Sequence, residues 1–526
     1  MARKWWTLIV VCIGAFMLLL DITVVTVALP DIEVDLNASL TDLQWVLDAY
    51  ALGLATLTLI SGSLGDRIGR RLVFTTGMAI FTAASLLCAL SWDPVVLNLA
   101  RGIQGLGGAA MFGTTIALIV QEFTGRQRST ALAIWGATVG VAVAAGPLIG
   151  GALVDSLGWP WIFYINVPIG VAAIVLSAFR LRETREPQTG GLDWLGVVAS
   201  SASLFFLVFG ILRGNPAGWT SGEVLGSLIA GGVLLPVFVV IELRQANPMF
   251  DMRLFRLPTF TGASVTAFAM ASSIFAMLAY FVLYLQNVLG HSAIEAGLAL
   301  LPITGLTFVF SAIAGVLVKR VPIRVILFVG LAFIGFGFVA IYGLDPGSDW
   351  KSLMLGFSLT GVGIGLVNPP LAEVAVIVLP SSRAGMLTGI NNTFRQVGVA
   401  TGIAVLGALL EHSVVVKMQD LLGNGPNAVA AISAQLGHAA ASGRVEAAFA
   451  AVPPVSRPLV LDASHEAFVS ALNELVLVSA VIAFVGAVIA GALIRARDYH
   501  PEAMTEVPLE GLAPSPTARP VPEEVR

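Results

Sequence analysis

The chain has 526 residues, of which 57% are hydrophobic and only 11% are charged, and its formal net charge is -4. Soluble globular proteins carry about 25% charged residues, so this composition excludes one soluble core and indicates a membrane protein with many spanning segments. The small net charge gives no sign of a nucleic-acid partner, and the two cysteines, both in apolar runs, form no disulfide framework.

Fourteen apolar segments have the length of about 20 residues that a membrane-spanning helix needs. The first follows Arg3 and Lys4 and is about 25 residues long, whereas the apolar core of a signal peptide has about 7–15. The segments are residues 5–29, 44–64, 72–91, 94–118, 129–153, 161–180, 193–212, 223–242, 260–288, 296–318, 322–343, 352–378, 385–410 and 467–494. We therefore predict an all-α polytopic membrane protein with fourteen transmembrane helices.

An internal repeat divides the chain. "GSLGDRIGRR" at 62–71 follows the second segment, and "GVLVKRVPIR" at 315–324 follows the tenth, at a constant offset of 253 residues. We predict two pseudo-repeated six-helix bundles at 5–180 and 260–494, with two inserted helices at 193–242 between them. Parallel halves of this kind are typical of transporters, with the substrate site between them near the bilayer midplane.

The distribution of basic residues predicts the orientation. With the N-terminus inside, the segments on the inner side hold 21 Lys and Arg and those on the outer side hold 5. By the positive-inside rule, both ends then lie in the cytoplasm. The Ala-rich stretch 411–466 becomes an extracellular loop, and the tail 498–526, rich in Pro and Glu, is expected to be disordered.

Two ionisable residues lie deep in the predicted membrane region. Asp21 in the first segment and Arg101 in the fourth both lie about 10–12 Å below the outer surface, at about 1.5 Å per residue. Such residues usually have a function, and no histidine lies in a span, so a carboxylate must carry any proton. We expect Asp21 and Arg101 to couple transport to protons; an ion pair that only holds the two helices together is the alternative. Glu373 and Glu474 lie near helix ends and are expected to be interfacial.

A second acidic residue, Asp48, is about one turn inside the second segment, beside Trp45 and Tyr50. A carboxylate with aromatic neighbours can bind a cation through charge and cation–π contacts, although Asp48 could instead be an interfacial residue exposed to water. We predict a substrate cavity at these three residues together with Gln104, Asn368 and Asn391.

The turn 62–71 has features of a helix–helix contact. Gly62 allows close approach of a neighbouring helix, Asp66 can cap a helix N-terminus or pair with an arginine, and Arg70 and Arg71 are expected to stay in the cytoplasm. A plain basic loop is the alternative. In the second copy of the repeat Lys319 replaces Asp66, so we expect the second turn to lack the same ion pair.

The fifth segment has a face of small residues. Gly136 and Gly140 are one turn apart, as are Gly146 and Gly150, and Pro147 can bend the helix. We expect this face to pack between the two halves. The glycine patterns of segments four and twelve lie in apolar helices with no strand before them, so they do not indicate a nucleotide site.

Several of these stretches resemble the fourteen-spanner drug:proton antiporter family of the major facilitator superfamily. The turn 62–71 fits the superfamily pattern G-x-L-x-D-R-x-G-R-[KR] at every position, and "GPLIGG" at 146–151 is similar to the antiporter motif of its drug exporters. "LDITVVTVALP" (20–30), "WIFYINVPIG" (161–170) and "NNTFRQVG" (391–398) also resemble that family. The resemblance implies a role for Arg101 in proton coupling. It also implies a conformational latch at Gly62, Asp66, Arg67, Gly69, Arg70 and Arg71, and an antiporter motif at Gly136, Gly140, Gly146, Pro147, Gly150 and Gly151.

We therefore expect a monomeric, proton-coupled antiporter of the plasma (inner) membrane that exports amphipathic, cationic drugs or antibiotics by alternating access. An exporter dedicated to a single natural product is one alternative, and a non-transporting membrane sensor on the same scaffold is another. We expect no enzyme, because the sequence has no nucleophile–base pair, metal-ligand cluster or phosphate loop in a suitable context. No cofactor or metal is expected.

Overall fold

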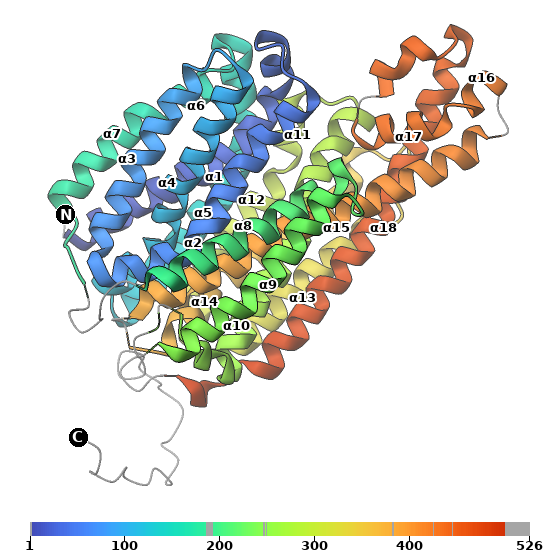
Figure 1. Ribbon diagram of the computed structural model, residues 1–526. Helices are drawn as coiled ribbons and strands as arrows, with labels where there is room; N and C mark the ends of the chain where they lie inside the picture. Colours follow the sequence, from blue (N-terminus) through green and yellow to red (C-terminus); the bar gives the residue numbers. More distant parts are fainter. Residues whose placement is uncertain are drawn as a thin grey trace, which may run out of the picture.

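The computed structural model describes residues 3–185, 193–245, 248, 250–380, 383–423, 426–443 and 445–499. These residues form helices and connecting turns, with no strand among them. The expected disordered tail lies outside the described residues from residue 500 on. We call the end of the helix bundle that holds the turn 62–71 the inner end, and the opposite end the outer end (Figure 1).

The first part of the chain forms seven helices whose starts follow from local sequence. Ser39 and Asp42 form a capping box at the start of α2, and Asp93 accepts a hydrogen bond from the Val95 amide (2.7 Å) at the start of α4. These helices are α1 (Arg3–Asp35), α2 (Leu40–Ile68), α3 (Arg70–Ala89), α4 (Pro94–Glu122), α5 (Gly125–Leu157), α6 (Trp161–Tyr164) and α7 (Asn166–Arg180). α6 and α7 together make one span, interrupted at Ile165.

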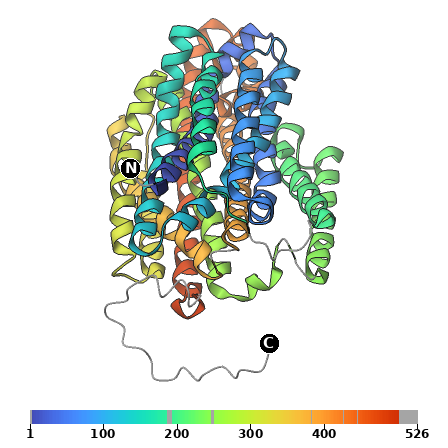
Figure 2. The same cartoon turned by 90° about the vertical axis from the view of Figure 1, so that its left-hand side faces the viewer.

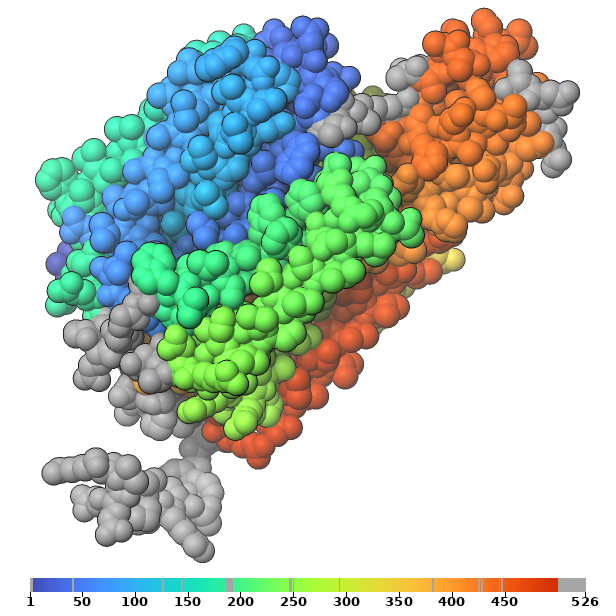
Figure 3. All heavy atoms as spheres, in the orientation of Figure 1, coloured from blue at the N-terminus to red at the C-terminus, as the bar shows by residue number. Residues whose placement is uncertain are grey.

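Two further helices, α8 (Trp194–Ala217) and α9 (Gly222–Arg244), pack against each other as a hairpin. Figure 2 shows this hairpin at the edge of the molecule, and Figure 3 shows it lying across the seam between the blue N-terminal helices and the orange and red C-terminal helices. Its outward face is apolar: Ile229 and Val233 are 65% and 59% exposed, as expected of side chains that meet lipid.

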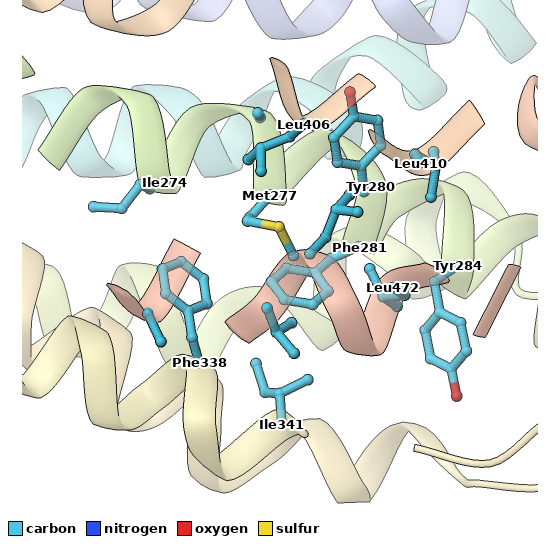
Figure 4. Packing of buried hydrophobic residues seen from close by; sticks show 14 of the residues in the cluster. Ile274, Met277, Tyr280, Phe281, Tyr284, Phe338, Ile341, Leu406, Leu410 and Leu472 are labelled. Atoms are coloured by element: carbon cyan, nitrogen blue, oxygen red, sulfur yellow. The ribbon is translucent and has the colours of Figure 1, made fainter. Parts of the chain in front are cut away.

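The last part of the chain holds the second set of helices. They are α10 (Pro258–Leu283), α11 (Ala293–Ala299), α12 (Leu301–Leu317), α13 (Ile323–Ile341), α14 (Met354–Ile377), α15 (Ala384–Leu422), α16 (Asn427–Ala430), α17 (Ser433–Ala441) and α18 (Arg457–Leu493). Their core is aromatic and aliphatic, with Phe281 packed edge-on against Phe357 at a centroid distance of 5.1 Å. Figure 4 shows Met277, Phe281 and Phe338 of this core converging from α10 and α13.

Thirteen helices of the described chain are long and apolar enough to cross a membrane, and α5 adds the apolar stretch Leu148–Leu157. The predicted fold is confirmed: an all-α membrane protein with two six-helix bundles and an inserted pair. α2 packs against α15, and α5 packs against α12, so these helices join the two halves. The domain boundaries at 180, 193, 242, 260 and 494 remain predictions.

Residues 411–466 were predicted to be a loop, but most of them are helical in the structure. α15 continues twelve residues past the expected end at 410, and α18 begins at Arg457, ten residues earlier than expected. With α16 and α17 they form a helical projection beyond the ends of the other helices (Figure 1). The stretch of mixed polarity that suggested a loop forms helices that pack on one another: Gly437 of α17, for example, approaches Val415 of α15.

Candidate functional site

A buried polar network connects α1, α4 and α7. Arg101 forms an ion pair with Asp21, and both side chains are about 1% exposed. Gln104 Nε2 donates to Asp21 Oδ1 at 2.9 Å, and Asn166 Nδ2 donates to the same oxygen at 3.0 Å. The structure therefore brings Asp21 and Arg101 into contact, and their role in proton coupling stays a prediction. Three donors surround one carboxylate, an arrangement that offsets much of the cost of burying a charge.

Arg101 is itself held on all sides. Its Nε donates to the backbone oxygen of Val46 at 2.9 Å, its Nη1 donates to Gln104 Oε1 at 2.6 Å, and its guanidinium lies 4.2 Å from the ring centroid of Tyr50. Tyr50 Oη in turn donates to the Leu18 oxygen at 3.1 Å. The structure thus places Tyr50 and Gln104, expected in a substrate cavity, inside the Asp21 network, where they are 2% and 0% exposed.

Asp48 and Trp45 lie apart from this network, facing the hairpin. Trp45 contacts Phe209 of α8 at a centroid distance of 5.9 Å, and the Arg213 guanidinium lies 5.9 Å from the Trp45 ring. Arg213 also pairs with Glu223 of α9 at 3.2 Å. Asp48 is partly exposed, and among the described residues none donates a hydrogen bond to it. Asp48 is therefore a partly exposed carboxylate that follows Trp45 by three residues on α2.

Asn368 and Asn391, the two asparagines of the second half that were predicted to line the substrate cavity, have different hydrogen-bond partners. Asn368 Oδ1 accepts a hydrogen bond from Arg395 Nη2 at 2.8 Å. Asn391 makes only a 3.5 Å contact to the Ala263 oxygen, whereas its neighbour Asn392 donates to the Phe112 oxygen of α4 at 3.0 Å. Of these two neighbouring asparagines, Asn392 is the one that bonds to the other half.

The turn 62–71 joins the halves at the inner end. Asp66 Oδ1 accepts from the Gly385 amide at 3.1 Å, and its Oδ2 accepts from the Met386 amide at 2.9 Å, so it binds the first turn of α15. Asp66 also pairs with Arg70 at 2.7 Å. It therefore fulfils both expected roles, capping a helix and pairing with an arginine. Gly62 faces the Gly385 and Gly389 backbone, which confirms the expected close approach.

Three further residues fix the geometry of this turn. Arg70 is only 4% exposed, because its guanidinium is held between Asp66 and the Ala117 oxygen (3.5 Å), and its location in the cytoplasm stays a prediction. The turn itself is made possible by Gly69, whose φ of 129° suits glycine. The Arg71 amide donates to Glu183 Oε1 at 3.2 Å, so Glu183 caps the start of α3.

A carboxylate also joins the halves at the second copy of the repeat, but it comes from another helix. Glu373 of α14 is 4% exposed and accepts from Ser129 Oγ of α5 at 3.3 and 3.4 Å, and Arg128 and Lys319 attract it electrostatically. Glu373 was expected to be interfacial; the structure instead buries it between α14 and α5. In place of an Asp66 equivalent, the second turn supplies a cation, Lys319.

The glycine face of α5 serves two contacts. Gly136 and Gly140 face Pro369 and Thr307 of the other half, as expected. Gly146 and Gly150 instead face α1 of the same half: a Cβ at Gly146 would lie 2.5 Å from Thr23 Cβ. The expectation that the whole face packs between the halves was therefore wrong for Gly146 and Gly150. Gly151 is buried, and the side chain of Pro147 lies outside the described residues.

Asn166 was not predicted from the sequence as a residue of these sites, and Glu373 was predicted only as an interfacial residue. Asn166 is the first residue of α7, directly after the interruption at Ile165, and a polar side chain within "WIFYINVPIG" was the available signal. Among the described residues, no group of three or more His, Cys, Asp or Glu could hold a metal ion.

Comparison with known proteins places the chain in a family. The profile of the Major Facilitator Superfamily matches residues 11–403. The tetracenomycin C resistance and export protein of Streptomyces glaucescens is 34% identical over 495 residues, which cover 93% of this chain and 91% of that protein. The multidrug resistance protein Stp of Mycobacterium tuberculosis is 34% identical over 405 residues, covering 77% and 75%.

Among solved structures, the human organic anion transporter MFSD10 (TETRAN) aligns with a TM-score of 0.60 at 14% identity, covering 92% of this chain and all of that one, which shows a shared fold. The fold, the turn 62–71 and the family match agree, and the chain belongs to the Major Facilitator Superfamily of membrane transporters.

Proposed function

We propose that the protein is a proton-coupled antiporter that exports amphipathic, cationic drugs or antibiotics by alternating access. It would act as a monomer in the plasma (inner) membrane, with both termini in the cytoplasm and the projection of α15–α18 outside. The observation that carries the proposal is the buried Asp21 carboxylate with its three donors, Arg101, Gln104 and Asn166. The named export and resistance functions of the relatives support it.

The network gives proton binding a structural consequence. In the geometry described, Asp21 accepts hydrogen bonds from one charged donor, Arg101, and from two amide donors, Gln104 and Asn166. Uptake of a proton would remove the ion pair and leave the Arg101 charge with the Val46 oxygen, Gln104 and the Tyr50 ring as its remaining partners. A buried cation that loses its counter-ion is costly, so protonation would drive a rearrangement of α1, α4 and α7.

Alternating access needs two states, and the contacts between the halves define one of them, in which the inner end is closed. Asp66 of α2 binds the start of α15, and Glu373 of α14 binds Ser129 of α5, so both carboxylates join the halves at the inner end. Opening towards the cytoplasm would break both contacts and expose both carboxylates to water. We propose that the two bundles, with boundaries near 5–180 and 260–494, move as the units of this exchange.

Asp48 is the group that we assign to cationic substrates. It is partly exposed, lies beside Trp45, and receives no hydrogen bond from the described residues. The one nearby cation, Arg213, is already paired with Glu223 at 3.2 Å. A substrate cation would therefore find a carboxylate and an aromatic ring together.

An exporter dedicated to one natural product is the second candidate. The tetracenomycin C resistance and export protein matches 93% of this chain, whereas the multidrug relative Stp matches 77%. A drug-susceptibility panel in a pump-deficient host, with and without a protonophore, separates the two. Protonophore-sensitive resistance to many compounds supports the multidrug function, and resistance to one compound supports the second candidate.

Proton coupling is tested by replacing Asp21 with asparagine, which keeps the shape and removes the charge. In proteoliposomes with an imposed pH gradient, Asp21→Asn should reduce transport of neutral and cationic drugs to the level of empty liposomes, and drug-induced proton release in detergent should disappear. Asp31→Asn is the matched control, because Asp31 lies on the same helix and is exposed. Proton release that persists in Asp21→Asn would assign the proton to another carboxylate.

A further inference from the structure

The second half holds a buried arginine that the proposed mechanism does not use. Arg395 lies on α15 and is only 8% exposed. Because α15 begins at Ala384, Arg395 lies about 16 Å along the helix from its inner end, at about 1.5 Å per residue. This is about half the thickness of the hydrocarbon core of a bilayer, which is about 30 Å. Arg395 is therefore near the midplane, the depth at which transporters built from two halves hold their substrates.

Arg395 differs from the other buried arginines in its partners. Arg101 and Arg70 each form an ion pair with a carboxylate, and Arg128 is attracted electrostatically by one. In the part of the chain that the structure describes, Arg395 has one hydrogen-bond partner, the neutral amide oxygen Asn368 Oδ1 at 2.8 Å, and no carboxylate within ion-pair distance. A guanidinium has five N–H donors, and a buried cation without a counter-ion destabilises the folded state. The burial of this charge is therefore compensated only in part.

Arg395 lies where the two halves meet. Its partner Asn368 of α14 faces α5 of the first half, because a Cβ at Gly136 would lie 3.5 Å from Asn368 Cβ. Asn392, three residues before Arg395 on α15, donates to the Phe112 oxygen of α4 at 3.0 Å. Two helices from each half therefore come together here, and we call this region, marked by these five residues, the central junction. A ligand bound in it would touch both halves, as alternating access requires of a substrate site.

A second donor at the central junction lacks an acceptor. Trp135 of α5 directly precedes Gly136, is 1% exposed, and packs its ring against that of Phe112 at a centroid distance of 6.4 Å. Its Nε1 has no hydrogen-bond partner among the described residues. A buried N–H without an acceptor is costly and is rare in native structures. The junction thus combines a cation without a counter-ion and an N–H without an acceptor, and an anion would satisfy both groups.

We propose that the central junction binds the carboxylate of an amphipathic substrate, with Arg395 as its counter-ion and the Trp135 N–H as a second donor. The planar guanidinium suits a carboxylate because it can donate two parallel hydrogen bonds, and the rings of Phe112 and Trp135 offer apolar contact to the rest of the molecule. This site rests on the proposed export function and deepens it, because it extends the substrate class from amphipathic cations to amphipathic acids and zwitterions.

The test uses two dyes that differ only in the carboxylate. Rhodamine B carries a carboxylate and a delocalised cation, whereas rhodamine B ethyl ester carries the cation alone. Binding of each dye to the purified full chain in detergent is followed by fluorescence anisotropy at neutral pH, and the parent chain should bind the acid more tightly than the ester. Arg395→Gln should weaken binding of the acid about tenfold, which corresponds to about 1.4 kcal/mol. It should leave the ester unchanged or bound slightly more tightly, because a repelling charge is removed.

Three further variants locate the effect. Arg395→Lys keeps the charge but loses the planar fork, so its affinity for the acid should lie between those of the parent chain and Arg395→Gln. Trp135→Phe removes the N–H and keeps an aromatic ring, so it should weaken binding of the acid by a few-fold and spare the ester. Arg383→Gln is the matched control, since Arg383 directly precedes α15 and is exposed, and it should change neither affinity.

The thermal midpoint of the ligand-free protein separates ligand binding from a structural role of Arg395. Arg395→Gln should keep or raise this midpoint, because the substitution removes a buried charge that lacks a counter-ion, as is common when a binding residue is lost. An arginine that only holds helices together would lower the midpoint on removal. A parent chain that does not prefer the acid, or an Arg395→Gln variant that binds both dyes equally weakly and melts earlier, would overturn the anion site.

Transport of the same dyes keeps this site distinct from the proposed function. If proteoliposomes with a pH gradient move neither dye, but binding prefers the acid and depends on Arg395, the export proposal fails and the anion site stands. If the ester is transported and the acid is not bound, the export function stands and the anion site fails. Asp48→Asn should weaken binding of both dyes, because both carry the cation, whereas Arg395→Gln should affect the acid alone.

Discussion

Adding one methyl group at Gly62 should open the inner end. A Cβ there would overlap the carbonyl oxygen of Gly385 and would lie 2.9 Å from the Gly385 carbonyl carbon and 3.0 Å from Gly389 Cα. Carbon atoms pack at about 3.5–4.0 Å, so α2 and α15 must separate by about 0.5–1 Å at this crossing. The obstacle is backbone, which cannot rotate away as a side chain can.

That separation breaks the Asp66 contact. Its bonds to the Gly385 and Met386 amides are 3.1 and 2.9 Å long, so the added distance takes both to the limit of a hydrogen bond. Hydrogen bonds to charged groups contribute about 1.5–3 kcal/mol each, so Gly62→Ala should destabilise the closed state by about 3 kcal/mol or more. A change of about 3 kcal/mol alters the equilibrium more than a hundredfold.

The assay is pH-gradient-driven drug transport in proteoliposomes at equal protein abundance. The conformational readout is the rate at which a membrane-impermeant maleimide labels a cysteine introduced at Met386 (Met386→Cys). Gly62→Ala should show fast labelling and little transport. Gly315→Ala should have a smaller effect, because its nearest neighbour is the Ala133 Cβ at 2.9 Å. Gly232→Ala is the control, since nothing lies within 4 Å of a Cβ there. Normal transport by Gly62→Ala would refute the packing argument.

Three further substitutions test the other contacts. Asp48→Asn should weaken efflux of cationic drugs, dications most, and leave neutral drugs largely unaffected in the same liposomes; an equal loss for both classes would contradict the substrate role. Gly146→Leu should lower the thermal midpoint and abolish transport, because the side chain would enter the space of Thr23 in α1; a folded, active variant would contradict the α1–α5 packing. Glu373→Gln keeps the bond to Ser129 but removes the charge that Arg128 and Lys319 attract. It should slow transport by a few-fold and raise Met386→Cys labelling, and unchanged labelling would show that the charge has no part in closure.

The sequence predicts those parts of the structure that depend on local pattern or on one strong physical constraint. The length of apolar runs was enough to find the spans, and the cost of charge in the membrane pointed to Asp21 and Arg101 before any contact was known. The sequence could not predict hydrogen-bond partners that are brought together by the packing of helices distant in the chain. Asn166 reaches Asp21 only because α7 begins beside α1; a polar side chain in an apolar stretch marks Asn166 in the sequence but does not identify its partner.

The errors at the second repeat and at the outer end have the same origin. The second copy of the repeat has Lys319 in place of Asp66, so its sequence suggested that the second turn makes no contact through a carboxylate. In the structure, Glu373 of α14 provides that carboxylate. The helices of the projection escaped detection because Ala-rich stretches of mixed polarity have no membrane-length apolar run. The meeting of Asp193 and Glu242 was equally hidden, since the two residues come together only when α8 and α9 pair.

The length of α15 has a mechanical consequence. Its 39 residues contain no proline and extend about 58 Å as one helix, from the amides that bind Asp66 to the packing site of α17. A stiff rod of this length works as a lever: a tilt at its inner end displaces the tip by an amount that grows with distance from the pivot. With the projection outside the cell, as proposed, an antibody fragment that grips α17 in one orientation would stall the exporter without crossing the membrane, and tip displacement would provide a signal of turnover in single molecules.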